Sequence, residues 1–110
     1  MNEQTKQLLD KLNELFDEVE KRLQRTPGAY HRTIQLDIDN DGSFLYCEDG
    51  TLYVGKDGGE PIRTAKITER IKATYFIPTL FELVNDADSR LESELLEQID
   101  FLEQFLANTD

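Results

Sequence analysis

The sequence is poor in the residues that build metal centres, disulfides and catalytic sites. It has one cysteine (Cys47), one histidine (His31) and no tryptophan among its 110 residues. A lone cysteine excludes an internal disulfide, and one Cys with one His is too small a ligand set for a zinc site. No apolar run approaches the roughly 18 residues of a membrane span. The polar residues 2–11 do not match a signal peptide, so we expect a cytoplasmic protein.

Sequence motifs for catalysis are also missing. There is no G-x-S-x-G, no H-E-x-x-H and no phosphate-binding glycine loop. The glycine-rich residues 55–59 lack the Lys-Ser/Thr pair of a P-loop and are followed by Pro61. We therefore expect no enzymatic activity and no cofactor.

Negative charge is what the sequence has in excess. Twelve Lys and Arg stand against 23 Asp and Glu, a net charge of −11. Residues 61–75 carry four bases and one acid, a net of +3, whereas residues 76–110 carry nine acids and one base, a net of −8. Such a surface repels nucleic acid and anionic membranes, so we expect it to bind neither. The charge either keeps the protein soluble or attracts a protein partner with a basic surface.

The apolar pattern of the first quarter predicts a helix over residues 3–25. Leucine, phenylalanine and valine recur there at alternating steps of three and four, and Leu8 and Leu15 widen the stripe. Thr26, Pro27 and Gly28 follow and end the helix.

The middle of the chain, residues 32–65, predicts an antiparallel meander of three or four strands. Asp-Gly, a strong hairpin signal, occurs at 41–42, 49–50 and 57–58 between alternating apolar residues. All three turns place one apolar set on one face of the sheet, which comprises Ile34, Leu36, Ile38, Leu45, Cys47, Leu52, Val54 and Ile62.

The turn lengths also predict the strand register. Two-residue turns at 41–42 and 49–50 pair Ile38 with Leu45, Leu36 with Cys47, Leu45 with Val54, and Cys47 with Leu52. A three-residue loop at 57–59 sets Ile62 beside Val54, and Pro61 marks an edge strand.

The C-terminal part, residues 66–107, predicts helices. Ile67 and Ile71 indicate a short helix, and Pro78 suits the first turn of another. Residues 85–88 suggest a break, or at least a weak point, before a last helix over about 88–107. Pro78 leaves open either one kinked long helix or two short ones. Its apolar stripe is Leu91, Leu95, Ile99, Leu102 and Leu106, and we expect this stripe to cover the sheet. Residues 1–110 thus read as one α+β domain, with amphipathic helices packed on one face of the sheet.

Residues 37–48 match the pattern of a calcium loop. Asp37, Asp39, Asp41 and Glu48 stand at ligand positions, and Gly42 suits the sharp turn. The flanking sequence alternates as in strands, whereas a calcium-binding EF-hand needs a helix on each side. The hairpin is therefore the favoured interpretation, and a calcium-binding module stays an alternative.

Two surfaces are candidates for partner binding. The outer face of the predicted sheet combines aromatic and acidic side chains, and the last helix carries a row of carboxylates on the side away from its stripe, with Phe101 among them. The candidate residues are Asp37, Asp39, Phe44, Tyr46, Tyr53, Glu92, Glu97, Asp100, Phe101 and Glu103.

These observations favour a small, acidic, non-enzymatic protein that binds another protein as an adaptor, a chaperone-like protein or an inhibitor. An alternative is an inhibitor of phage or mobile-element type, which mimics nucleic acid and occupies a nucleic-acid-binding protein. The stripes of the first and last helices leave both a monomer and a homodimer open, since a stripe that the sheet does not cover would pair across a two-fold axis.

Overall fold

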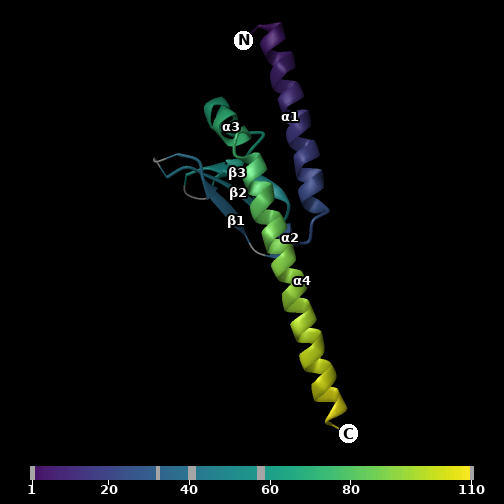
Figure 1. The fold of residues 1–110 in the computed structure, drawn as a ribbon. Coiled ribbons are helices and arrows are strands. Elements are labelled where there is room, and N and C mark those ends of the chain that lie inside the picture. Colours follow the sequence, from purple (N-terminus) through teal and green to yellow (C-terminus); the bar gives the residue numbers. More distant parts are fainter. Residues whose placement is uncertain (1, 32, 40–41, 57–58, 110) are drawn as a thin grey trace.

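The chain folds into an α+β structure, as the sequence predicts. The computed structural model describes residues 2–31, 33–39, 42–56 and 59–109. In chain order the elements are α1 (Glu3–Gln24), α2 (Gly28–His31), β1 (Ile34–Asp37), β2 (Phe44–Glu48), β3 (Thr51–Gly55), β4 (Glu60–Pro61), α3 (Ile67–Thr74) and α4 (Ile77–Ala107). The four strands form one antiparallel sheet in the order β1-β2-β3-β4, and helices pack against it (Figure 1).

Helix α1 follows its apolar pattern closely. The side chain of Asn2 caps it by accepting a hydrogen bond from the backbone N–H of Thr5 at 2.8 Å. Phe16 and Leu23 are buried in the core. The N-terminal half is more open, since Leu8 is 64% exposed and Leu15, near the middle of the helix, is 50% exposed.

The hairpin between β2 and β3 has the predicted register. Leu45 pairs with Val54, and Cys47 pairs with Leu52. Asp49 and Gly50 have φ angles of 53° and 77°, the two positive values that a type I′ turn requires.

The predicted register between β1 and β2 is wrong by two residues. Leu36 pairs with Leu45, and the Ile38 N–H donates to the Ser43 carbonyl at 3.1 Å. The connection is therefore longer than a two-residue turn at 41–42, and Asp39 stabilises it by accepting a hydrogen bond from the Ser43 N–H. A shift of two residues keeps every side chain on its predicted face, so Ile38 remains buried.

The register between β3 and β4 is shifted by two residues as well. Val54 pairs with Glu60, and the Ile62 N–H donates to the Leu52 carbonyl at 3.0 Å, so Ile62 lies beside Leu52 and not beside Val54. Ile62 is still buried, because the shift is even. Pro61 lies on the edge strand, as predicted. The predicted loop residues 57 and 58 fall outside the described residues.

Helix α4 does not break at residues 85–88, contrary to the sequence prediction. It runs without interruption from Ile77 to Ala107, with Pro78 in its first turn. Tertiary contacts explain this continuity. Val84 precedes the polar residues and Ala87 lies among them, and both are buried. The Asp88 carboxylate accepts a hydrogen bond from the Gly28 N–H at 2.8 Å.

The molecule is long for its size. Its principal extents are 72 × 28 × 19 Å and its radius of gyration is 18.4 Å, against about 13 Å for a compact domain of this length. The N-terminus of α1 and the C-terminus of α4 lie at opposite ends (Figure 1). Among the described residues, no helix is both long and apolar enough to cross a membrane.

Candidate functional site

The C-terminal half of α4 leaves the folded body and projects beyond the sheet (Figure 1). We call residues 91–107 the projecting segment. Leu91 is half-buried, and every residue from 92 to 107 is exposed. The buried residues of α4 are Leu80, Val84 and Ala87, all in its N-terminal half. The segment contains neither glycine nor proline, so its backbone continues the helix without tertiary support.

The apolar stripe of this segment does not cover the sheet, contrary to the sequence prediction. Leu95, Ile99, Leu102 and Leu106 are 47%, 52%, 55% and 67% exposed. The four-stranded sheet is short, and the N-terminal half of α4 already packs against it. Monomeric soluble proteins rarely expose a contiguous stripe of this kind, and such stripes mark interaction surfaces.

The side of the segment opposite the stripe is acidic. The segment holds five carboxylates and no basic residue. By the helical period, Glu97 and Asp100 lie opposite the stripe, whereas Glu92 and Glu103 border it, nearer than the sequence analysis placed them. All four are exposed, and so is Phe101, at 70%. We call Glu97, Asp100 and Phe101 the outer side of the segment.

The outer face of the sheet gathers the other predicted residues. Tyr46 and Tyr53 pair across β2 and β3, and their rings stack with centroids 5.0 Å apart and planes 12° from parallel. Because of the register shift, Asp37 lies opposite Phe44 and not opposite Tyr46. Asp39 forms an ion pair with Lys72 at 3.0 Å.

These aromatic rings are half-buried, so this face is neither fully covered nor fully open. Desolvation raises the pKa of Tyr46, with smaller contributions from Glu48 and Tyr53. The Tyr–Tyr stack stabilises the sheet as cross-strand aromatic pairs do, which accounts for it without a ligand.

The two predicted surfaces lie on different elements. The tyrosine pair belongs to the sheet, whereas the carboxylates of the last helix lie on the part of α4 beyond the sheet (Figure 1). A partner that binds the outer side of the segment is therefore recognised by α4 alone.

The calcium-like residues lie in and around the β1–β2 hairpin. Strands flank the loop on both sides, where an EF-hand has helices. Asp41 is outside the described residues, and across the described ones no group of three or more His, Cys, Asp or Glu is arranged to hold a metal ion.

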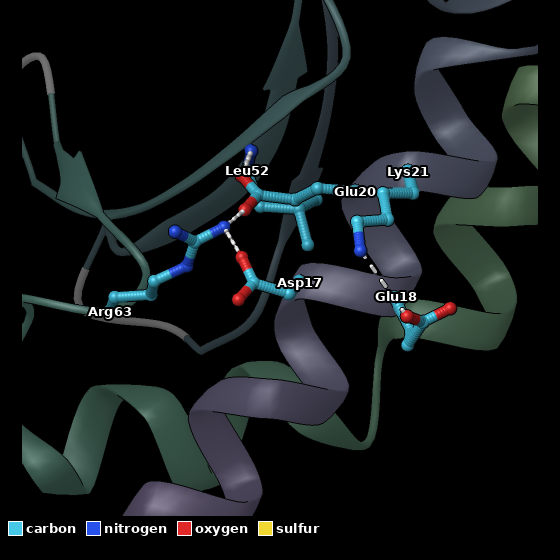
Figure 2. Close-up of polar contacts among 6 residues, drawn as sticks. All are labelled: Asp17, Glu18, Glu20, Lys21, Leu52 and Arg63. Carbon is cyan, nitrogen blue, oxygen red and sulfur yellow. Dashed lines mark hydrogen bonds and ion pairs between the residues drawn. The ribbon is translucent and has the colours of Figure 1, made fainter.

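A buried carboxylate that the sequence analysis missed joins α1 to the sheet. Glu20 is 6% exposed, and it accepts a hydrogen bond from the Leu52 N–H at 2.8 Å. Its other oxygen bonds Arg63, whose guanidinium also contacts Asp17 (Figure 2). The neighbouring pair of Lys21 and Glu18, 3.5 Å apart, is exposed by comparison (Figure 2). This cluster satisfies a backbone donor of β3 and fixes α1 against the segment that follows β4.

One signal in the sequence pointed to Glu20. It lies four residues after Phe16 and three before Leu23, which places it on the buried side of the helix. A carboxylate at a buried position requires a hydrogen-bond partner. Arg63 lies far from Glu20 in sequence, so the sequence alone does not identify it as that partner.

Comparison of the chain with known protein families, curated proteins and solved structures gives no match. The candidate site therefore depends on the geometry of this chain alone.

Helix α2 fixes the direction in which the segment projects. Gly28 lies so close to α4 that a β-carbon there would lie 2.5 Å from the Asp88 nitrogen and 2.6 Å from the Val84 carbonyl oxygen. Together with the Gly28–Asp88 hydrogen bond, this close approach holds the N-terminal half of α4 against the body. The candidate site is thus a helix anchored at one end and open to solvent at the other.

Proposed function

We propose that the protein is a non-enzymatic binding protein whose contact element is the projecting segment of α4. Its partner is another protein with a basic surface, and the outer side of the segment, Glu97, Asp100 and Phe101, makes the contact. The observation that supports this proposal most is that a helix half carrying five carboxylates and no base extends into solvent, with a 70% exposed aromatic ring among the acids.

The two kinds of side chain have different physical roles. Exposed ion pairs contribute little each, about 0–1 kcal/mol, but a one-sign surface speeds the encounter with an oppositely charged one. Aromatic side chains such as Phe101 supply the buried centre of an interface, where most of the binding energy resides. An acidic helix with one exposed aromatic ring therefore suits a basic surface that has an apolar pocket.

The proposal is tested by pull-down from host lysate at low and high salt, with identification by mass spectrometry. The bait variant Glu97→Lys/Asp100→Lys reverses two charges on the outer side. The control Asp10→Lys/Glu82→Lys makes the same change in net charge at two exposed acids elsewhere. We expect the wild type and the control to retain a basic partner at low salt, and the outer-side variant to lose it.

Equal retention by all three baits contradicts the proposal, because the outer side then contributes nothing. Equal loss from both variants also contradicts it, because net charge alone then governs binding. A partner that is bound only through the outer face of the sheet, with Tyr46 and Tyr53, would stay bound at high salt. It would also bind both variants as well as the wild type.

A second candidate function is mimicry of nucleic acid. Glu97, Asp100 and Glu103 follow one another at steps of three along an exposed helix, which gives a line of negative charge. If this is the function, the captured partner binds DNA or RNA, and nucleic acid competes with the protein for it. A partner that holds both at once excludes mimicry and leaves simple protein binding.

A further inference from the structure

The apolar stripe of the projecting segment requires a cover that the body does not supply. Leu95, Ile99, Leu102 and Leu106 lie on the same side of α4 as Leu80 and Val84, by the helical period. The side that packs into the core therefore continues, uncovered, past the end of the sheet. A surface that covers the stripe therefore lies on the same side of α4 as the sheet, beyond the end of the sheet.

Charge disfavours a second projecting segment as the cover. Two such segments side by side would bring together ten carboxylates, five from each, without one base. Glu92 and Glu103 border the stripe, so they would lie at the contact, and like charges there oppose pairing. The cover must instead be apolar at its centre and basic at its rim.

The chain carries a surface of that kind on α3. Ile67, Ile71 and the C-cap residue Tyr75 follow one another at steps of four, so they lie along one side of the helix and its C-terminal end, and they are 40%, 49% and 79% exposed. Lys66 and Lys72, both exposed, lie beside them, and Lys72 also forms the ion pair with Asp39 at 3.0 Å. We call these five residues the α3 patch. It lies in residues 61–75, which have a net charge of +3.

The two surfaces cannot meet within one molecule. Helix α3 ends at Thr74, three residues before α4 begins, and the projecting segment leads away from it to the far end of the molecule (Figure 1). Because α4 is one continuous helix, its C-terminal half does not fold back. An α3 patch that covers the stripe would therefore come from another copy.

We propose that the protein forms a two-fold dimer in which the stripe of each projecting segment packs on the α3 patch of the other copy. The patch and the segment lie toward opposite ends of the long dimension of the molecule (Figure 1). A two-fold axis perpendicular to that dimension brings both patch–segment contacts together at once when the patch and the stripe face the same side of the molecule, and the assembly then closes as a dimer. The outer side of each segment stays open, so this dimer is independent of the partner binding proposed above.

The first test is the mass in solution, measured by sedimentation or by light scattering after size exclusion, over a range of concentrations. The wild type is expected to have twice the mass of one chain. Leu102→Asp on the stripe and Ile71→Asp on the patch each give monomers, whereas Phe101→Asp, with the same change of charge on the other side of the segment, stays dimeric. Circular dichroism checks that the three variants fold, which is expected because all three positions are exposed.

The second test is disulfide cross-linking between copies. A protein with Ile71→Cys is mixed with one carrying Leu102→Cys and oxidised under native conditions. The native Cys47 is fully buried, and burial raises the pKa of its thiol, so it stays unreactive. The mixture is expected to give a cross-linked dimer that each variant alone forms far more slowly.

Three results overturn the proposal. A wild type that is monomeric at high micromolar concentration has no such contact. Rapid cross-linking of Leu102→Cys with itself shows that two segments pair with each other. Masses that grow beyond the dimer with concentration show a head-to-tail contact that does not close.

Discussion

At the scale of single residues, Glu20 is the side chain that most constrains the fold. It is the one charged side chain among the described residues that is buried. It accepts hydrogen bonds from two groups at once, the Leu52 N–H and the Arg63 guanidinium. A buried carboxylate is stabilising only while its partners remain. If either the carboxylate or a partner is removed, the other group stays buried with no hydrogen bond to protein or water.

We expect Glu20→Ala to lower the free energy of unfolding by about 2–3 kcal/mol, since it leaves the Leu52 N–H unpaired in the core. Glu20→Gln should cost less, because the amide oxygen still accepts that hydrogen bond. Urea unfolding monitored by circular dichroism measures both, in a monomeric background such as Leu102→Asp so that association does not contribute.

The matched control is Glu18→Ala, which removes an exposed carboxylate from the same helix. Its effect should stay within about 0.5 kcal/mol, because exposed ion pairs contribute little. If Glu20→Ala and Glu18→Ala destabilise the protein equally, the buried cluster has no special role.

At the scale of elements, the sequence predicted the order and faces of the structure better than its connections. Helix α1, the β2–β3 hairpin and the start of α4 at Pro78 are confirmed, because local patterns determine them. The registers of β1 and β4 are wrong by two residues, because loop length depends on side-chain contacts such as that of Asp39 with Ser43. Both shifts are even, so the predicted apolar face of the sheet is still correct, although Leu36 on that face is only half-buried.

The predicted break in α4 failed for a related reason. Asn85, Asp86 and Asp88 are weak helix formers, and local propensity favours an interruption there. Burial of Val84 and Ala87 and the bond from Gly28 to Asp88 outweigh this propensity. The sequence also identified the carboxylates of the last helix as candidate contacts, but it could not show that half of the helix projects from the body, since periodicity reveals a stripe and not what covers it.

This division of α4 predicts two rates of amide hydrogen exchange within one helix. In the monomeric variant Leu102→Asp, amides of residues 95–107 should exchange at least about tenfold faster than those of residues 80–91, because only the latter have tertiary contacts. In the wild type at high concentration, the segment should become protected. Mass spectrometry of peptic peptides measures both.

The N-terminal half of α1 provides an internal reference for this measurement. Residues 3–8 are exposed, so their amides should exchange rapidly at every concentration, whereas those around Phe16 and Leu23 should be protected. Uniform protection along α4 in the monomeric variant would mean that its C-terminal half has tertiary contacts of its own.

At the scale of the whole molecule, the distribution of charge matters more than its sum. The net charge of −11 opposes the compact state through self-repulsion. The basic stretch 61–75 and the acidic stretch 76–110 nevertheless lie next to each other in sequence, and α4 carries much of the negative charge away from α3. This separation gives the molecule one basic apolar surface and one acidic apolar surface.

Added salt should therefore act in opposite directions on folding and on dimerisation. Raising the ionic strength from low to high screens the repulsion within each chain, so the free energy of unfolding of the monomeric variant Leu102→Asp should stay constant or rise. The same screening weakens the attraction between the α3 patch and the borders of the stripe, so the dissociation constant of the wild-type dimer should rise several-fold. Sedimentation and urea unfolding over the same salt series measure the two quantities. A dimer that salt tightens, or leaves unchanged, would be held by apolar contact alone, and the α3 patch would then have no advantage over any other exposed apolar surface of the chain.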